Sequence, residues 1–162
     1  MDNEQLVQLQ SQMGQGENSQ DQYLTFFMDN EEYGIDILSI QEIRGFDATT
    51  CIPNAPDFIQ GVMNLRGTIV PIVDLRLRFG LERIPYGDIT VVIVVKTKLD
   101  DGEKIIGMVV DSVSDVYSVN HNESTRAPDV GEADNREFLK GLVNVGEKMV
   151  VLLDLKKILT FN

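Results

Sequence analysis

The sequence has few of the residues on which enzyme chemistry usually depends. Its 162 residues include one cysteine (Cys51), one histidine (His121) and no tryptophan. A single cysteine cannot form an internal disulfide, and the spacing typical of metal ligands is absent. These residues cannot supply a nucleophile, a base and an orienting group, and no glycine-rich phosphate loop occurs. We therefore expect no catalytic activity, metal or cofactor, with Cys51 as a buried thiol and His121 in a solvated loop.

Long apolar runs and an excess of positive charge are also missing. No apolar run is longer than that of residues 91–95, far short of the roughly 20 residues needed to cross a bilayer. The N-terminus lacks the basic and apolar segments of a secretory signal. With 26 acidic and 14 basic residues, the formal net charge is −12, which disfavours nucleic acid or anionic lipid as a partner. We expect a cytoplasmic protein whose partners are apolar or locally basic.

The chain divides by composition into a polar tail and a region of short strands. Residues 1–21 are rich in glutamine and contain no aromatic residue, so we expect a disordered tail. From Tyr23 onwards, short apolar runs alternate with turn residues such as Asp29 and Asn30. Many short strands at close spacing predict barrels or sandwiches, with a few short helices, and not alternating strand–helix units.

An internal repeat is the most informative feature. Residues 59–76 (IQGVMNLRGTIVPIVDLR) align without a gap on residues 139–156 (LKGLVNVGEKMVVLLDLK), and residues 33–43 align more weakly on residues 106–116. Two matched blocks in the same order predict two copies of one β unit, at roughly 22–84 and 85–162, whose strands could exchange. Because a unit this small buries little surface alone, the two copies should pack together and leave an apolar groove at their seam.

Asp74 and Asp154 occupy equivalent positions in the two copies. A two-lobed acid protease would pair two aspartates in this way, but here each aspartate precedes leucine and a basic residue, and not the small residue and glycine of such sites. Each aspartate also ends an apolar strand and precedes a short run. We therefore expect both carboxylates to cap helix N-termini.

Three segments point to contact surfaces. Arg66 corresponds to Gly146 in the second copy, so the repeated structure alone does not require an arginine at this position. Arg66 is therefore either a solvated turn residue or a recognition residue. Gly67, the next residue, permits the turn. Residues 90–96 (TVVIVVK) are apolar on both strand faces, so either this protein covers both faces or one face awaits a partner. Residues 40–45 (IQEIRG) mix apolar and charged side chains.

Together these residues resemble the CheW family of bacterial chemotaxis coupling proteins. The resemblance covers roughly residues 22–161, and it is carried by EEYGIDILSIQEIRG (31–45), IQGVMNLRGTIVPIVDLR (59–76), TVVIVV (90–95) and IIGMVVDSVSDV (105–116). It implies two intertwined, SH3-like, five-stranded β-barrels and an adaptor without catalytic activity.

The resemblance also implies partners and contact residues. The partners would be the regulatory domain of the chemotaxis histidine kinase and the cytoplasmic tip of the chemoreceptors, so that any membrane association is indirect. The contact residues carried over from the family are Ile40, Glu42, Arg66, Val91 and Val92. The residues expected to have structural roles, Gly67, Asp74 and Asp154, follow from the turn and capping patterns above. The groove between the barrels would receive a helical hairpin from the receptor.

Three other readings stay open at this point. The nearest is a related regulatory β-module that binds other two-component signalling proteins without a role in receptor arrays. An acid hydrolase using Asp74 and Asp154 is the enzyme alternative, and turnover of a peptide would reveal it. A nucleic-acid-binding SH3-like barrel is the third, and a gel shift at low salt would detect it.

Overall fold

The computed structural model describes residues 6, 20–46, 49–100, 102–120, 124–125 and 138–160. In chain order its elements are β1 (Gln20–Met28), β2 (Glu31–Asp36), η1 (Ile37–Ser39), β3 (Ile40–Gly45), β4 (Ile59–Leu65), β5 (Thr68–Asp74), α2 (Leu75–Arg78), β6 (Val91–Leu99), β7 (Gly102–Val110), β8 (Ser112–Asn120), β9 (Ser124–Thr125), β10 (Leu139–Val145), β11 (Lys148–Leu153) and α3 (Leu155–Leu159). No helix among these residues is long and apolar enough to cross a membrane.

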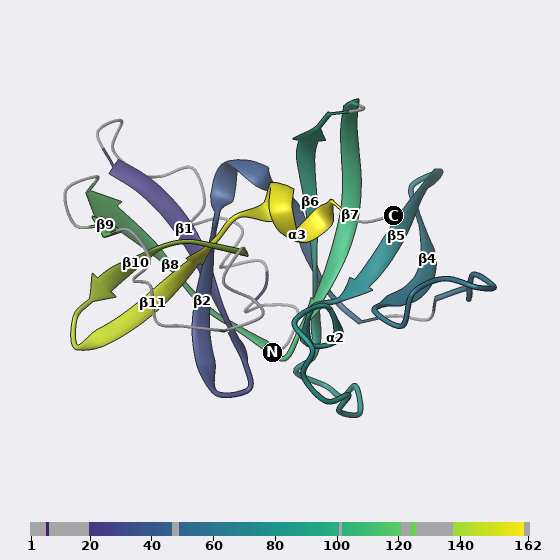
Figure 1. The fold of residues 1–162 in the computed structure, drawn as a ribbon, viewed down its shortest axis with the longest axis horizontal. Coiled ribbons are helices and arrows are strands. Elements are labelled where there is room, and N and C mark those ends of the chain that lie inside the picture. Colours follow the sequence, from purple (N-terminus) through teal and green to yellow (C-terminus); the bar gives the residue numbers. More distant parts are fainter. Residues whose placement is uncertain are drawn as a thin grey trace.

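The strands form two curled sheets that lie side by side (Figure 1). One sheet has six strands in the order β8-β1-β2-β11-β10-β9, and the other has five strands in the order β3-β6-β7-β5-β4. The short helix α3 lies between the sheets: it follows β11 of the six-stranded sheet and contacts β6 of the five-stranded sheet. The prediction of a mainly β fold with two packed barrels and a few short helices is confirmed.

The two copies of the repeat are intertwined. The first copy gives its β1–β2 hairpin to the six-stranded sheet, but β3, β4 and β5 to the five-stranded sheet. The second copy gives its β6–β7 hairpin to the five-stranded sheet, but β8, β10 and β11 to the six-stranded sheet. The same parallel contact joins the copies in each sheet, β5 beside β7 and β11 beside β2. Sheet membership therefore does not follow a single cut of the chain near residue 84.

The apolar core has a shared part between the sheets and a smaller part inside each sheet. Strand β6 shows how they are divided. Val91, Ile93 and Val95 point into the shared cluster, whereas Val92 and Val94 point into the cluster of the five-stranded sheet. All five side chains are buried, so this protein itself covers both faces of the strand.

Equivalent aspartates begin the short helices. The Asp74 carboxylate accepts a hydrogen bond from the Leu77 N–H at 3.3 Å, at the start of α2. The Asp154 carboxylate accepts one from the Lys157 N–H at 3.4 Å, at the start of α3. Each bond satisfies a backbone donor that the first turn of the helix leaves without an intrahelical partner.

A β-bulge is repeated at the glycines that open the two matched blocks. Pairing shifts register between Ile59 and Gly61 in β4, and between Leu139 and Gly141 in β10. At Gly61 φ is +135°, and an added Cβ would lie 2.3 Å from the carbonyl oxygen of Thr50. No other residue fits there, because both the backbone conformation and the close approach require glycine.

One expectation outside the strands is wrong. Cys51 is exposed, because it belongs to the turn-rich segment between β3 and β4 and not to the cores. His121 and most of the polar tail lie outside the described residues. The tail residue Leu6 is described, and its side chain is buried in the shared cluster.

Candidate functional site: an edge ion pair and an open groove

Glu42 and Arg66 come together at the edge of the five-stranded sheet. Arg66 Nη2 lies 2.7 Å from Glu42 Oε2, and Arg44 Nη1 lies 3.8 Å from Glu42 Oε1. Glu42 is on β3, the first strand in the sheet order, whereas Arg66 is in the turn between β5 and the last strand, β4. The pair therefore joins the two sides of the curled sheet and forms a charged rim at its opening.

The backbone at Arg66 has a conformation that arginine rarely adopts. The φ angles of Arg66 and Gly67 are 51° and 88°, so both central residues of the hairpin turn are left-handed, as in a type I′ turn. The Gly67 N–H donates a hydrogen bond to Asn64 Oδ1 at 2.8 Å. A left-handed conformation costs a residue with a side chain about 1 to 2 kcal/mol. The Arg66 side chain is 77% exposed, and an exposed ion pair contributes less than about 1 kcal/mol, so folding alone does not account for the arginine.

The other predicted contact residues differ in accessibility. Ile40 is partly buried against the shared cluster at the same edge. Val91 and Val92 are 1% and 0% exposed, so a direct side-chain contact with a partner does not fit the structure. The run is apolar on both strand faces because Val91 packs into the shared cluster and Val92 packs into the cluster of the five-stranded sheet. The predicted surface reduces to Ile40, Glu42 and Arg66.

Two exposed apolar residues were missed from the sequence. Ile69 is 59% exposed on β5, paired with Asn64 next to the Arg66 turn, and Leu38 is 89% exposed in η1. The signal for Ile69 was its alternation with Val70 and Ile72, which are buried on the opposite face. No comparable signal existed for Leu38, because η1 is too short to show a periodicity.

An open groove of about 280 Å³ lies where the two sheets meet. Its apolar lining is Leu153 and Leu155, and its polar lining is Asp36, Ser39, Thr97, Lys140, Asp154 and Lys156. Thr97 belongs to β6 of the five-stranded sheet, whereas the other residues come from or follow strands of the six-stranded sheet. A groove is thus present at the seam of the two copies, but it is not the apolar groove that the sequence predicted, because six of its eight lining residues are polar and its walls carry charges of both signs.

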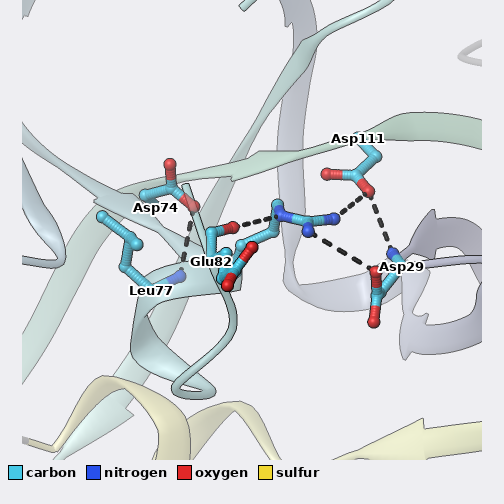
Figure 2. Close-up of polar contacts among 6 residues, drawn as sticks. Asp29, Asp74, Leu77, Glu82 and Asp111 are labelled. Carbon is cyan, nitrogen blue, oxygen red and sulfur yellow. Dashed lines mark hydrogen bonds and ion pairs between the residues drawn. The ribbon is translucent and has the colours of Figure 1, made fainter. Parts of the chain in front are cut away.

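An ion-pair network around the buried side chain of Arg76 fills the corresponding seam on the other copy. Arg76, whose side chain is 9% exposed, lies 2.7 Å from Asp111 Oδ2 through Nη1 and 3.5 Å from Asp29 Oδ1 through Nη2. Its Nε donates to the Glu82 carbonyl at 2.8 Å (Figure 2). Asp29 is in the β1–β2 turn and Asp111 connects β7 to β8, so the network ties the two sheets together.

Next to this network, the Tyr86 side chain closes the rest of the seam. Its hydroxyl donates a hydrogen bond to Asp74 Oδ2 at 2.5 Å. Burial, with a further contribution from the bond to the Asp74 carboxylate, raises the pKa of Tyr86 well above its usual value. The remaining cavity there has about 10 Å³.

Arg78 links the two copies on the side of α3. Its guanidinium carbon lies 5.0 Å from the ring centroid of Phe58 and 4.7 Å from that of Phe138, which are equivalent residues of the repeat. Its Nε also donates to the carbonyl of Ile158 at 2.8 Å, near the C-terminus of α3. A cation is favourable at this end of a helix, so Arg78 holds α3 against the first copy.

Within the described ranges, no group of three or more histidine, cysteine, aspartate or glutamate side chains is placed to hold a metal ion. The two regions offer groups suited to recognition: an exposed ion pair at a sheet edge, and a groove with ammonium and carboxylate groups on its walls. Both suit the binding of other proteins.

Comparisons with known proteins agree with this geometry. Residues 22–161 match the family model described as CheW-like domain. The chain is 48% identical over 145 residues to the chemotaxis protein CheW of Klebsiella aerogenes, covering 90% of this chain and 85% of that protein. It is 31% identical over 135 residues to the chemotaxis protein CheW of Rhizobium meliloti, covering 83% and 84%.

A solved structure is also similar. The scaffolding protein TtCheW from Thermoanaerobacter tengcongensis superposes with a TM-score of 0.78 at 29% sequence identity, covering 88% of this chain and 94% of that one. Residues 22–161, which match the family model, span both sheets and include the Glu42–Arg66 edge. The chain therefore belongs to the CheW family.

Proposed function

We propose that this protein is a non-enzymatic chemotaxis adaptor that holds the cytoplasmic tip of chemoreceptors and the regulatory domain of a histidine kinase at the same time. Its relatives are named as chemotaxis proteins, and the similar solved structure is named as a scaffold. Two separate contact regions, each without catalytic groups, suit an adaptor. The protein would be cytoplasmic and would reach the membrane only through the receptors.

The Glu42–Arg66 edge is the observation that carries the proposal. Arg66 adopts a costly left-handed conformation and keeps its side chain 77% exposed, at a position where the second copy has glycine. Exposed arginines are frequent hot spots of protein interfaces. We assign this edge, with Ile40 and Ile69 as its apolar part, to the kinase domain.

We assign the groove between the sheets to the receptor. The groove has only two apolar lining residues, Leu153 and Leu155, so it would take individual side chains of a receptor helix and not the whole apolar face of that helix. Because its walls come from both sheets, a shift of the receptor tip would alter how the two sheets are held relative to each other. The signal would then pass mechanically to the kinase at the Arg66 edge, with no covalent change in the adaptor.

Co-sedimentation with membranes that carry receptor and kinase tests the proposal. The wild-type protein should sediment with receptor alone and should retain the kinase. Arg66→Ala should weaken kinase binding by roughly 30-fold, since a hot-spot arginine contributes about 2 kcal/mol or more. Receptor binding should stay near the wild-type level.

Different failures have different meanings. Unfolding of Arg66→Ala in place of weakened binding would show a structural role for the arginine. Binding of the kinase but not of the receptor would favour a regulatory module without an array role. Association with neither partner would refute the adaptor function.

A further inference from the structure

The two copies of the repeat place equivalent residues at two seams between the sheets, one of which is closed and the other open. In the matched blocks, Gln60, Asp74 and Arg76 of the first copy correspond to Lys140, Asp154 and Lys156 of the second. The first seam is closed, with a residual cavity of about 10 Å³, and the second is an open groove of about 280 Å³. The difference lies in what covers these three positions.

In the first copy, the segment after α2 occupies all three positions. The Glu82 carbonyl accepts from Arg76 Nε at 2.8 Å (Figure 2). Arg83 Nη1 donates to Gln60 Oε1 at 2.6 Å, and the Tyr86 hydroxyl donates to Asp74 Oδ2 at 2.5 Å. One short segment therefore supplies an oxygen to the arginine, a donor to the amide and a donor to the carboxylate.

In the second copy, the three counterparts line the groove. Asp154 uses Oδ1 to cap α3, as Asp74 caps α2. Lys156 Nζ lies 3.3 Å from Asp100, whose side chain is 97% exposed. An ion pair this exposed contributes little, so a partner carboxylate can replace Asp100 at small cost. The other acidic residue of the groove, Asp36, accepts from the Leu38 N–H at 2.9 Å.

We propose that partner side chains bind this groove at the positions that the segment after α2 occupies in the first copy. A hydroxyl or amide of the partner donates a hydrogen bond to Asp154, as Tyr86 does to Asp74. An acidic side chain of the partner lies between Lys140 and Lys156. In the first copy, Gln60 accepts a hydrogen bond from the cation of Arg83. Its counterpart in the second copy is Lys140, a cation, so the partner side chain at this position should be acidic.

This inference rests on the proposed function, in that the partner is the tip of a chemoreceptor. It adds the chemistry by which the tip is recognised. Charge complementarity at two lysines and one carboxylate gives partner choice and orientation, whereas the two leucines of the groove contribute apolar area.

Charge reversal in the groove tests the lysines. The full-length double variant Lys140→Glu with Lys156→Glu is titrated with a chemoreceptor cytoplasmic fragment, and binding is followed by fluorescence anisotropy. Affinity should fall by about tenfold or more, as expected for loss of hydrogen bonds to charged groups. The matched control is Lys157→Glu, an exposed neighbour on α3 that does not line the groove, and its affinity should match the wild type.

Asp154→Asn tests the carboxylate. Asparagine caps a helix as well as aspartate, so α3 should stay folded, but one oxygen acceptor becomes an amide donor. Receptor affinity should fall several-fold while the melting temperature stays within a few degrees of the wild type. In a reciprocal experiment, replacing acidic residues of the receptor tip by lysine should restore binding to the doubly reversed variant.

The outcomes separate the inference from the proposed function. If the wild type binds the receptor fragment and both groove variants bind equally well, the groove chemistry is refuted and the adaptor function stands. If the wild type does not bind the fragment, the receptor part of the proposed function fails. Kinase binding through the Arg66 edge should be unchanged in every groove variant.

Discussion

Arg66 and Gly146 occupy the same position in equivalent hairpin turns, and both have a left-handed backbone, with φ of 51° and 63°. Glycine adopts this conformation without steric cost, whereas arginine does so at a cost of about 1 to 2 kcal/mol. The second copy thus shows which residue the turn favours on conformational grounds. The arginine in the first copy is better explained by binding than by folding.

Arg66→Gly should separate these two roles. The substitution removes a strained residue and an exposed ion pair, so the free energy of unfolding should be unchanged or higher by up to about 1 kcal/mol. Kinase binding should weaken as in Arg66→Ala. Urea unfolding and a pull-down measure the two effects. A loss of more than about 1 kcal/mol would show that the Glu42 pair closes the sheet as a structural bond.

The Arg76 network should matter for folding far more than its equivalent in the second copy. Arg76→Met removes the cation that pairs with Asp111 and the donor to the Glu82 carbonyl, and should lower the free energy of unfolding by about 2 to 3 kcal/mol, although Asp111 Oδ2 still accepts from the Asp29 N–H. Lys156→Met breaks only the exposed pair with Asp100 and should cost less than about 1 kcal/mol. Equal losses in thermal or urea unfolding would contradict the difference in burial described above.

The raised pKa of Tyr86 predicts that the free energy of unfolding falls at alkaline pH. Its pKa is raised in the folded protein from an unfolded value near 10.0, so above pH 10 the unfolded chain loses the proton while the folded chain keeps it. The stabilisation is therefore complete below pH 10 and is lost as the pH rises towards the folded-state pKa. Tyr86→Phe should be less stable than the wild type at pH 7, because Asp74 loses a donor, by about 1 to 2 kcal/mol.

The difference between wild type and Tyr86→Phe should shrink between pH 10 and pH 11.5. Unfolding in urea at a series of pH values measures it. Burial also raises the pKa of Tyr33, but that residue is present in both proteins and cancels in the comparison. A constant difference across this range would show that the proton of Tyr86 is not linked to folding.

Much of the fold followed from patterns within the chain. The matched blocks at 59–76 and 139–156 predicted two copies of one β unit, and the short apolar runs between turn residues predicted many short strands. The exchange of hairpins between the copies was only an open possibility, because periodicity shows that a residue is buried but not which sheet buries it. Val91 and Val92 show the same limit: their apolar run fitted a binding face as well as two internal cores, and only the strand order decides between them.

The sequence predicted the candidate site only in part, because it does not show which residues the folded chain leaves uncovered. Arg66 stood out because its repeat partner is glycine. Glu42 lay in a segment of mixed apolar and charged residues, 40–45, and was singled out as a contact only through the family resemblance. The groove was expected at the seam, but its lysines were not. Lys140 and Lys156 line an open groove because no described segment covers them as residues 82–86 cover Gln60 and Arg76. That contrast is a property of the assembled fold.

The interleaved order of the strands sets the sequence in which the protein can be completed on the ribosome. The five-stranded sheet uses residues between 40 and 110, so all of its strands exist before the last third of the chain has been made. The β1–β2 hairpin, although synthesised first, must wait for β11 near the C-terminus. During translation, the strands of the five-stranded sheet with the Glu42–Arg66 edge can therefore pair before the six-stranded sheet is complete.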